Sequence, residues 1–188
     1  MMQHRYRDAR ALAKRLPARV RAPDIQLLLP YGVGESPMSA LLQGQSDLLL
    51  GDERDAEVQG RAVLEFVASR RANPRNDWYL KTLEAAGRLL SGDRAGAIAA
   101  TRQSLTLMPR SRDAVDWALT AYVGAVTYAW AGDEDGAVEL LEQLSTAVPG
   151  VAPVEITRSP NFTLPLAKNA RYKALQQKLE AQIAATTL

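Results

Sequence analysis

A Gly-Asp pair that recurs at nearly constant intervals constrains the fold of this 188-residue chain more than any other feature of its sequence. The pairs begin at Gly51, Gly92 and Gly132, which lie 41 and 40 residues apart. Glycine readily adopts the left-handed backbone conformation that ends a helix, and the aspartate after it can cap the next helix by accepting a hydrogen bond from a backbone N–H. Each pair therefore predicts a tight turn between two helices.

Small residues and prolines keep the same register around these turns. A small residue lies seven positions before each glycine and an alanine lies five positions after it, where close packing of two helices requires short side chains. These residues are Gly44, Ala85 and Ala125 before the turns, and Ala56, Ala97 and Ala137 after them. Pro109 and Pro149 follow the second and third glycines by seventeen positions, and proline cannot continue a helix interior. We therefore predict three antiparallel helix pairs.

The rest of the chain is also predicted to be helical, apart from two proline-rich segments at 17–37 and 148–166. No segment has the convincing pattern of a strand. The predicted helices cover residues 3–16, 38–50, 53–71, 77–91, 94–107, 112–131, 134–147 and 168–185. The fold class is therefore all-α. Three regions are expected: an N-terminal basic helix with its connection at 1–37, three helix pairs at 38–149, and a proline-rich loop with a capping helix at 150–188.

This register resembles that of the tetratricopeptide repeat, in which a small residue, Gly-Asp, alanine and proline follow in the same order. The third pair is the most similar, through Gly124, Ala125, Tyr128, Gly132, Ala137 and Pro149. The second pair departs from the family, because Lys81 and Arg88 stand where bulky apolar residues are usual. The interval also exceeds the family period of about 34 residues; HEAT-type repeats share the longer period but do not account for the glycine-to-proline distance. The resemblance implies a right-handed superhelical stack of helix pairs.

The C-terminal part carries a second resemblance. Residues 159–166, with the sequence SPNFTLPL, and the following Ala170-Arg171-Tyr172 look like the C-terminal end of repeat regions in bacterial multidomain regulators. Such regulators are commonly serine/threonine kinases or adenylate-cyclase-type proteins. Residues 107–114 are similar to a linker of the same group. The resemblance implies a regulatory repeat domain of a signalling protein, without the kinase or cyclase part.

The sequence offers little for catalysis or metal binding. Cysteine is absent and His4 is the single histidine, which excludes a histidine-containing triad, a cluster of histidine ligands and a thiolate site. Gly32-Val33-Gly34 lacks the strand and the third glycine of a phosphate-binding loop. Acidic residues at 52–57 and 133–135 are interpreted as helix starts, since acids there complement the helix dipole and no EF-hand spacing follows. We predict no catalytic residue, cofactor or metal, and a helical enzyme domain is the least favoured hypothesis.

The predicted function is protein binding on the concave side of the stack, which the first helices of the pairs would line. By register this surface comprises Leu41, Gln45, Tyr79, Thr82, Ala86, Tyr122 and Val126. The expected partner is an extended peptide or one helix, including a segment of the parent protein. Aromatic residues of the first helices suit either peptide contact or the core, and the core is favoured for the tryptophans.

Basic residues crowd the N-terminus, although the net charge of the chain is only +2. With Asp8 as the sole acid, they are Arg5, Arg7, Arg10, Lys14, Arg15, Arg19 and Arg21. A nucleic-acid arm, a helix on an anionic membrane and a transit peptide all need such a cluster. We favour a simpler interpretation, a helix with a solvated basic face and an apolar stripe at helical spacing. This stripe comprises Tyr6, Ala9, Leu12, Ala13 and Leu16.

Nucleic-acid binding through the N-terminal helix is kept as the alternative function, from a different class. Its signature would be a steep loss of binding with rising salt. No apolar run is long enough for a transmembrane helix, and the N-terminus lacks the apolar core of a signal peptide. A cytoplasmic protein is therefore expected.

Overall fold

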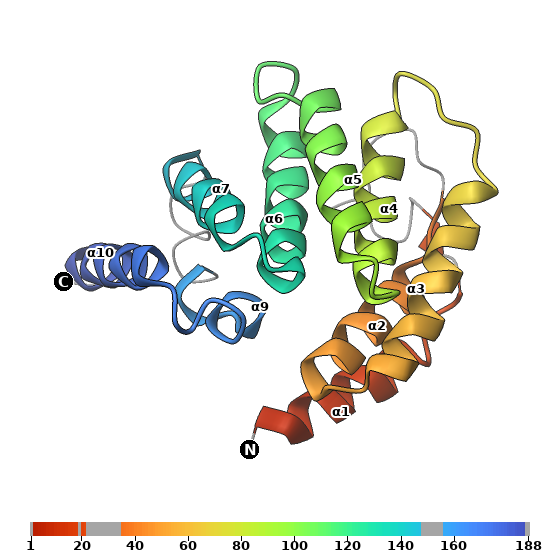
Figure 1. The fold of residues 1–188 in the computed structure, drawn as a ribbon, viewed down its shortest axis with the longest axis horizontal. Helices are drawn as coiled ribbons and strands as arrows, with labels where there is room; N and C mark the ends of the chain where they lie inside the picture. The colour runs from red at the N-terminus through yellow and green to blue at the C-terminus, as the bar shows by residue number, and fades with distance from the viewer. Residues whose placement is uncertain (1, 19, 22–34, 148–155, 187–188) are drawn as a thin grey trace. The chain divides into compact units, whose positions relative to one another are not determined.

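The computed structural model describes residues 2–18, 20–21, 35–147 and 156–186. It confirms the predicted helical class, with helices packed in consecutive pairs (Figure 1). Strands β1 (Val20–Arg21) and β2 (Glu35–Ser36) form one short antiparallel pairing that was not predicted. Two residues are too few to display the alternation by which a strand is recognised in a sequence.

The chain divides into two compact units at Leu107 and Met108. Unit 1, Met1–Leu107, contains α1 (Met2–Ala13), α2 (Met38–Leu50), α3 (Glu53–Ala68), α4 (Asp77–Leu90) and α5 (Arg94–Leu107). Unit 2, Met108–Leu188, contains α6 (Ala114–Ala131), α7 (Glu134–Ala147), α9 (Pro160–Thr163) and α10 (Ala170–Thr186). Two of the predicted helix pairs, α2/α3 and α4/α5, thus lie in unit 1, and the third, α6/α7, lies in unit 2.

Helices α1 and α3 end at Ala13 and Ala68, three residues earlier than predicted. Local hydrogen bonds account for the starts of two other helices that differ from the prediction. Helix α6 begins two residues late because Asp113 is extended and its carboxylate caps the helix, accepting from the backbone N–H groups of Val115 and Asp116 at 2.8 and 2.9 Å. Helix α10 begins after Asn169, whose side-chain oxygen accepts from the N–H of Tyr172. The single turn α9 was not predicted at all.

The three Gly-Asp turns have the predicted backbone conformation. Gly51, Gly92 and Gly132 have φ angles of 77°, 81° and 93°, and they are the positive-φ residues of the described chain. Such angles favour glycine because a Cβ would clash with the backbone. The same turn therefore closes each helix pair.

The aspartates of these turns cap the following helix in two of the three pairs. Asp93 accepts from the N–H of Gly96 at 2.9 Å, and Asp133 accepts from the N–H of Gly136 at 3.2 Å. Asp52 makes no side-chain cap, so the predicted cap is wrong there. Its carboxylate accepts a hydrogen bond from Arg10 instead.

Small residues lie at the helix contacts, as predicted. The alanines five residues after the turns, Ala56, Ala97 and Ala137, are at most 1% exposed, and the small residues before the turns are also buried. A second close contact was not predicted: a Cβ added to Gly60 of α3 would lie 2.7 Å from the carbonyl oxygen of Gly87 in α4. Backbones this close leave no room for a side chain.

The charged residues of α4 that depart from the tetratricopeptide pattern form an ion-pair network. Glu84 accepts hydrogen bonds from Lys81 at 2.7 Å and from Arg88 at 2.9 Å, and Arg88 also bonds Asp93 at 2.6 Å. Partial burial raises the pKa of Glu84, but the two cations outweigh that effect and lower it. Charges at these positions are thus paired along the helix surface.

Unit 2 is closed by the segment that follows its helix pair. Phe162 and Leu166 are fully buried, and the Tyr172 hydroxyl donates to the carbonyl oxygen of Ile156 at 2.7 Å. Arg171 at the start of α10 pairs with Glu142 of α7. Burial raises the pKa of Tyr172. The C-terminal helix is therefore tied to α7 and to the segment before α9.

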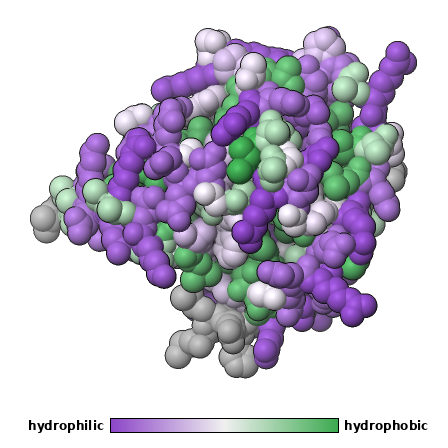
Figure 2. Space-filling view, viewed as in Figure 1, coloured by the Kyte–Doolittle hydropathy of each residue, from purple (hydrophilic) through white to green (hydrophobic). Residues whose placement is uncertain are grey.

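The interpretation of the tryptophans as core residues is confirmed for two of them. Trp78 and Trp117 are 1% and 6% exposed, whereas Trp130 is half-buried. On the face shown in Figure 2, hydrophilic side chains cover most of the surface, with hydrophobic residues between them. Within the described residues, no helix is both long and apolar enough to cross a bilayer.

Replacing Ala97 by leucine tests the close packing of the α4/α5 pair. Ala97 is 0% exposed, so a larger side chain must displace its neighbours, and we expect the free energy of unfolding to fall by about 1–3 kcal/mol. Ala99→Leu on the exposed side of the same helix is the control and should change it by less than about 0.5 kcal/mol. Equal urea-unfolding curves for both variants would contradict the proposed packing.

Candidate functional site

The residues predicted to bind a partner lie on the first helix of each pair. Leu41 and Gln45 of α2 and Ala86 of α4 are half-buried, and so are Tyr122 and Val126 of α6. Tyr79 and Thr82 of α4 are buried. In unit 1, therefore, Leu41, Gln45 and Ala86 are the members of the predicted surface with accessible side chains.

Tyr79 is covered by the segment that precedes α2. Its side chain is 5% exposed, and its hydroxyl donates to the Ser36 hydroxyl oxygen at 2.9 Å. Burial raises the pKa of Tyr79 to about 12, an effect that the bond to Ser36 opposes. Thr82 is satisfied internally, since its hydroxyl donates to the carbonyl oxygen of Trp78. Neither residue presents its polar group to a partner in this structure.

In unit 2 the predicted surface is in contact with the chain's own C-terminal segment. The rings of Tyr122 and Phe162 meet edge to face, with centroids 5.6 Å apart. The indole N–H of Trp130 donates to the carbonyl oxygen of Asn161 at 3.0 Å. Tyr122, Val126 and Trp130 are spaced by four residues and therefore share one side of α6. The segment around α9 contacts that side at both ends.

A pocket between α2 and α3 was not predicted from the sequence. Its volume is about 310 Å³, and its lining residues are Ala18, Pro37, Ser39, Ala40, Gln43, Gln59, Ala62, Glu65 and Phe66. Polar and apolar side chains share this wall about equally, and the Gln43 amide donates to the Ser39 hydroxyl at 2.9 Å. Such a lining suits an apolar side chain with a polar end. No single sequence motif marks it, because its walls come from separate segments.

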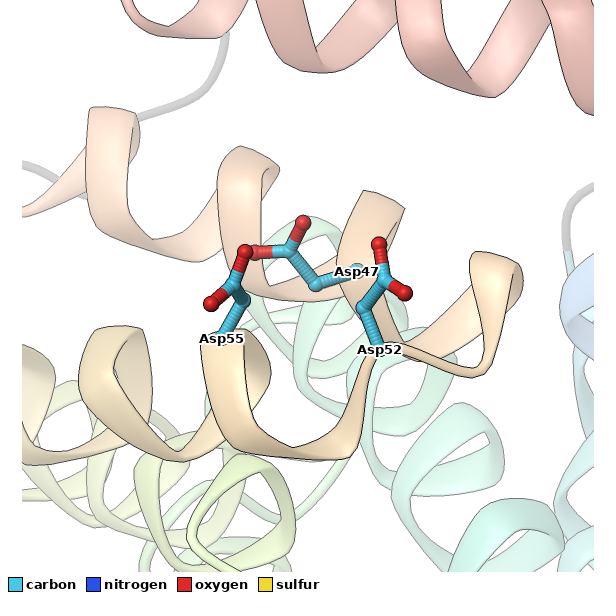
Figure 3. A group of neighbouring side chains, drawn as sticks. All are labelled: Asp47, Asp52 and Asp55. Carbon is cyan, nitrogen blue, oxygen red and sulfur yellow. The ribbon is translucent and has the colours of Figure 1, made fainter.

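An acidic cluster lies at the turn between α2 and α3 (Figure 3). It consists of Asp47, Asp52 and Asp55, whose carboxylate oxygens lie within 4.8 Å of one another. Arg10 of α1 meets all three: its Nη1 atom is 3.0 Å from Asp47, 2.9 Å from Asp52 and 3.8 Å from Asp55. The hydrogen bond to Asp47 is the main cause of a raised Arg10 pKa. We therefore interpret the cluster as the site where Arg10 docks α1.

The docking of α1 differs from the orientation predicted for its apolar stripe. Ala13 is 2% exposed, but Leu12 and Leu16 are 62% and 37% exposed. The stripe does not pack as a whole, because the helix ends at Ala13, before Leu16, and because other contacts set its rotation. The Arg10 guanidinium donates a hydrogen bond to Asp47 of α2, and the Ser39 hydroxyl donates to the carbonyl oxygen of Ala13 at 2.9 Å. The structure says nothing of Arg19 or of the His4 side chain, which lie outside the described set.

Comparison with family models, with curated proteins and with solved structures finds no match for this chain.

Replacing Arg10 by methionine tests the docking of α1. Asp47 is 2% exposed and would lose its cation, so we expect the free energy of unfolding to fall by about 2–3 kcal/mol. The exposed Arg7→Met is the matched control and should have little effect. Adding Asp47→Asn to Arg10→Met should restore part of the loss, because no buried charge is then left unpaired. Unfolding of the Arg10 variant identical to the wild type would refute the docking interaction.

The buried Tyr79 hydroxyl should make the folded chain less stable at alkaline pH. Its pKa rises from 10.0 to about 12 in the folded chain, so the stabilisation is complete below pH 10 and is lost as the pH rises towards 12. In Tyr79→Phe, the fall in the free energy of unfolding at high pH should be smaller by about 2–3 kcal/mol. The part of that fall caused by Tyr172 should remain. Urea unfolding of the wild type and of Tyr79→Phe between neutral pH and pH 12 measures how the free energy of unfolding of each protein falls with pH. Parallel curves for the two proteins would exclude the buried environment of Tyr79.

Proposed function

We propose that this chain is a tetratricopeptide-type repeat module that binds another protein and carries out no catalysis. The observation that supports it is the recurrence of one structural unit. Three turns share a left-handed glycine, with φ of 77°, 81° and 93°, and each is followed after five residues by a buried alanine. Repeat proteins of this kind act through side chains displayed on a continuous face. In this proposal the pairs form a right-handed superhelical stack.

The proposed binding surface in unit 1 lies on α2 and α4. Leu41, Gln45 and Ala86 are its half-buried members, and a small residue such as Ala86 leaves room for a partner side chain. An extended peptide or one helix would bind through a few apolar anchors surrounded by polar contacts. The pocket between α2 and α3 offers one place for such an anchor.

The C-terminal likeness to bacterial regulators suggests where such a module acts. We propose a regulatory repeat region of a cytoplasmic multidomain signalling protein, whose partner is another protein or another domain of the parent chain. Nucleic-acid binding remains the alternative, and it depends on the basic residues of the N-terminal segment alone. Tyr122 is a poor probe of binding, because its ring also supports Phe162 within unit 2.

Site-specific photo-crosslinking tests the proposed surface. A benzophenone amino acid placed at Gln45 or Ala86 should crosslink to the same protein, and one at the exposed Ala99 of α5 should not. With that protein purified, Ala86→Arg should raise the dissociation constant about tenfold or more in calorimetry, since a charge would enter the apolar contact. Ala99→Arg is the control. Crosslinking from Ala99 alone, or unchanged affinity for Ala86→Arg, would exclude this surface.

A further inference from the structure

Helix α1 is docked with an arginine facing its neighbour and leucines facing outward. Arg10 contacts Asp47 and Asp52, while Leu12 is 62% exposed and Leu16 is 37% exposed. Arg5 and Leu12 are seven residues apart and share one side of α1, and Leu16 follows three residues after the helix ends at Ala13. Covering exposed leucine side chains with an apolar partner is favourable, because it removes their surface from water. Leu12 and Leu16 therefore form a small exposed apolar edge at the end of α1.

Helix α1 and the turn that follows it carry an excess of exposed positive charge. Arg5, Arg7, Lys14 and Arg15 are exposed, and Asp8 is the one acid between residues 5 and 16. None of the four cations forms an ion pair with a described residue. Four cations against one anion give a local field that attracts an anionic surface. The partner of α1 must therefore offer both negative charge and an apolar layer.

We propose that α1 binds the surface of an anionic lipid bilayer. The helix would lie in the plane of the membrane, with Leu12 and Leu16 at the boundary between headgroups and acyl chains. Long arginine and lysine side chains keep their charges at the level of the lipid phosphates while their stems remain in apolar surroundings. The bond between Arg10 and Asp47 holds this face outward before binding, so the chain need not reorganise to meet the membrane.

Charge and apolarity together favour lipid over the other anionic partners. The phosphates of a nucleic acid would pair with the cations but would offer the leucines no apolar contact. A second copy of α1 would bring like charges together, which opposes association. A bilayer containing anionic lipid satisfies both features at once. This inference does not depend on the proposed binding of a protein by α2 and α4.

Sedimentation with lipid vesicles tests the proposal on the full chain. The wild type should bind phosphatidylcholine vesicles that contain phosphatidylserine, and should not bind phosphatidylcholine alone. Leu12→Ser with Leu16→Ser should weaken binding on the order of tenfold or more, and Arg5→Ser with Arg15→Ser on the order of twentyfold. Val115→Ser, which replaces a 79% exposed residue of unit 2, and Lys173→Ser in α10 are the matched controls.

The absence of cysteine allows a second measurement that does not rely on weakened variants. A cysteine introduced at Leu12 and labelled with an environment-sensitive dye should show a blue shift with anionic vesicles. The same label at Val115 should not. Equal binding to neutral vesicles, unaltered binding of the leucine variant or an unshifted label at position 12 would overturn the proposal. Tight binding to duplex DNA that the leucine variant retains would overturn it in favour of nucleic acid.

Discussion

Close approach of helix backbones is the constraint on which the fold depends. Two helices can pack tightly only where the side chains between them are small, and three alanines, Ala56, Ala97 and Ala137, meet that requirement at equivalent places. The positive φ of each turn glycine sends the chain back along the preceding helix. Between α3 and α4 the same requirement is met by Gly60 against the backbone of Gly87. Larger side chains at any of these places would separate the helices.

One buried carboxylate has consequences for a whole surface. Asp47 is almost fully buried at the end of α2, and a charge in that position requires a cation. Arg10 supplies it, which sets the rotation of α1 and directs Leu12 outward, and Leu16 is exposed just beyond the end of the helix. The amphipathic pattern of α1 would otherwise turn its leucines towards the protein. An electrostatic contact inside unit 1 thereby creates the basic and apolar face for which we infer a lipid surface.

The predicted partner surface is shaped by segments that lie outside the repeat pattern. Ser36 binds the hydroxyl of Tyr79 on α4, and Phe162 packs against Tyr122 on α6. The side chains of both aromatic residues thus contact other parts of the protein. The accessible residues of the predicted surface in unit 1 are Leu41, Gln45 and Ala86. A protein-binding function would depend on these smaller side chains and on the neighbouring pocket, with little contribution from aromatic anchors.

The sequence by itself determined the helices, their turns and the buried small residues, because these follow from backbone conformation and local spacing. It could not determine that Asp52 would bond Arg10 in place of its own helix, that Gly60 would meet Gly87, or that Leu12 would stay exposed. Each of these outcomes depends on a neighbour at least 27 residues away along the chain or on the rotation of a whole helix. Periodicity identifies an apolar stripe, but only the tertiary structure decides which way it faces, because buried charge and backbone contacts compete with the leucines for that choice.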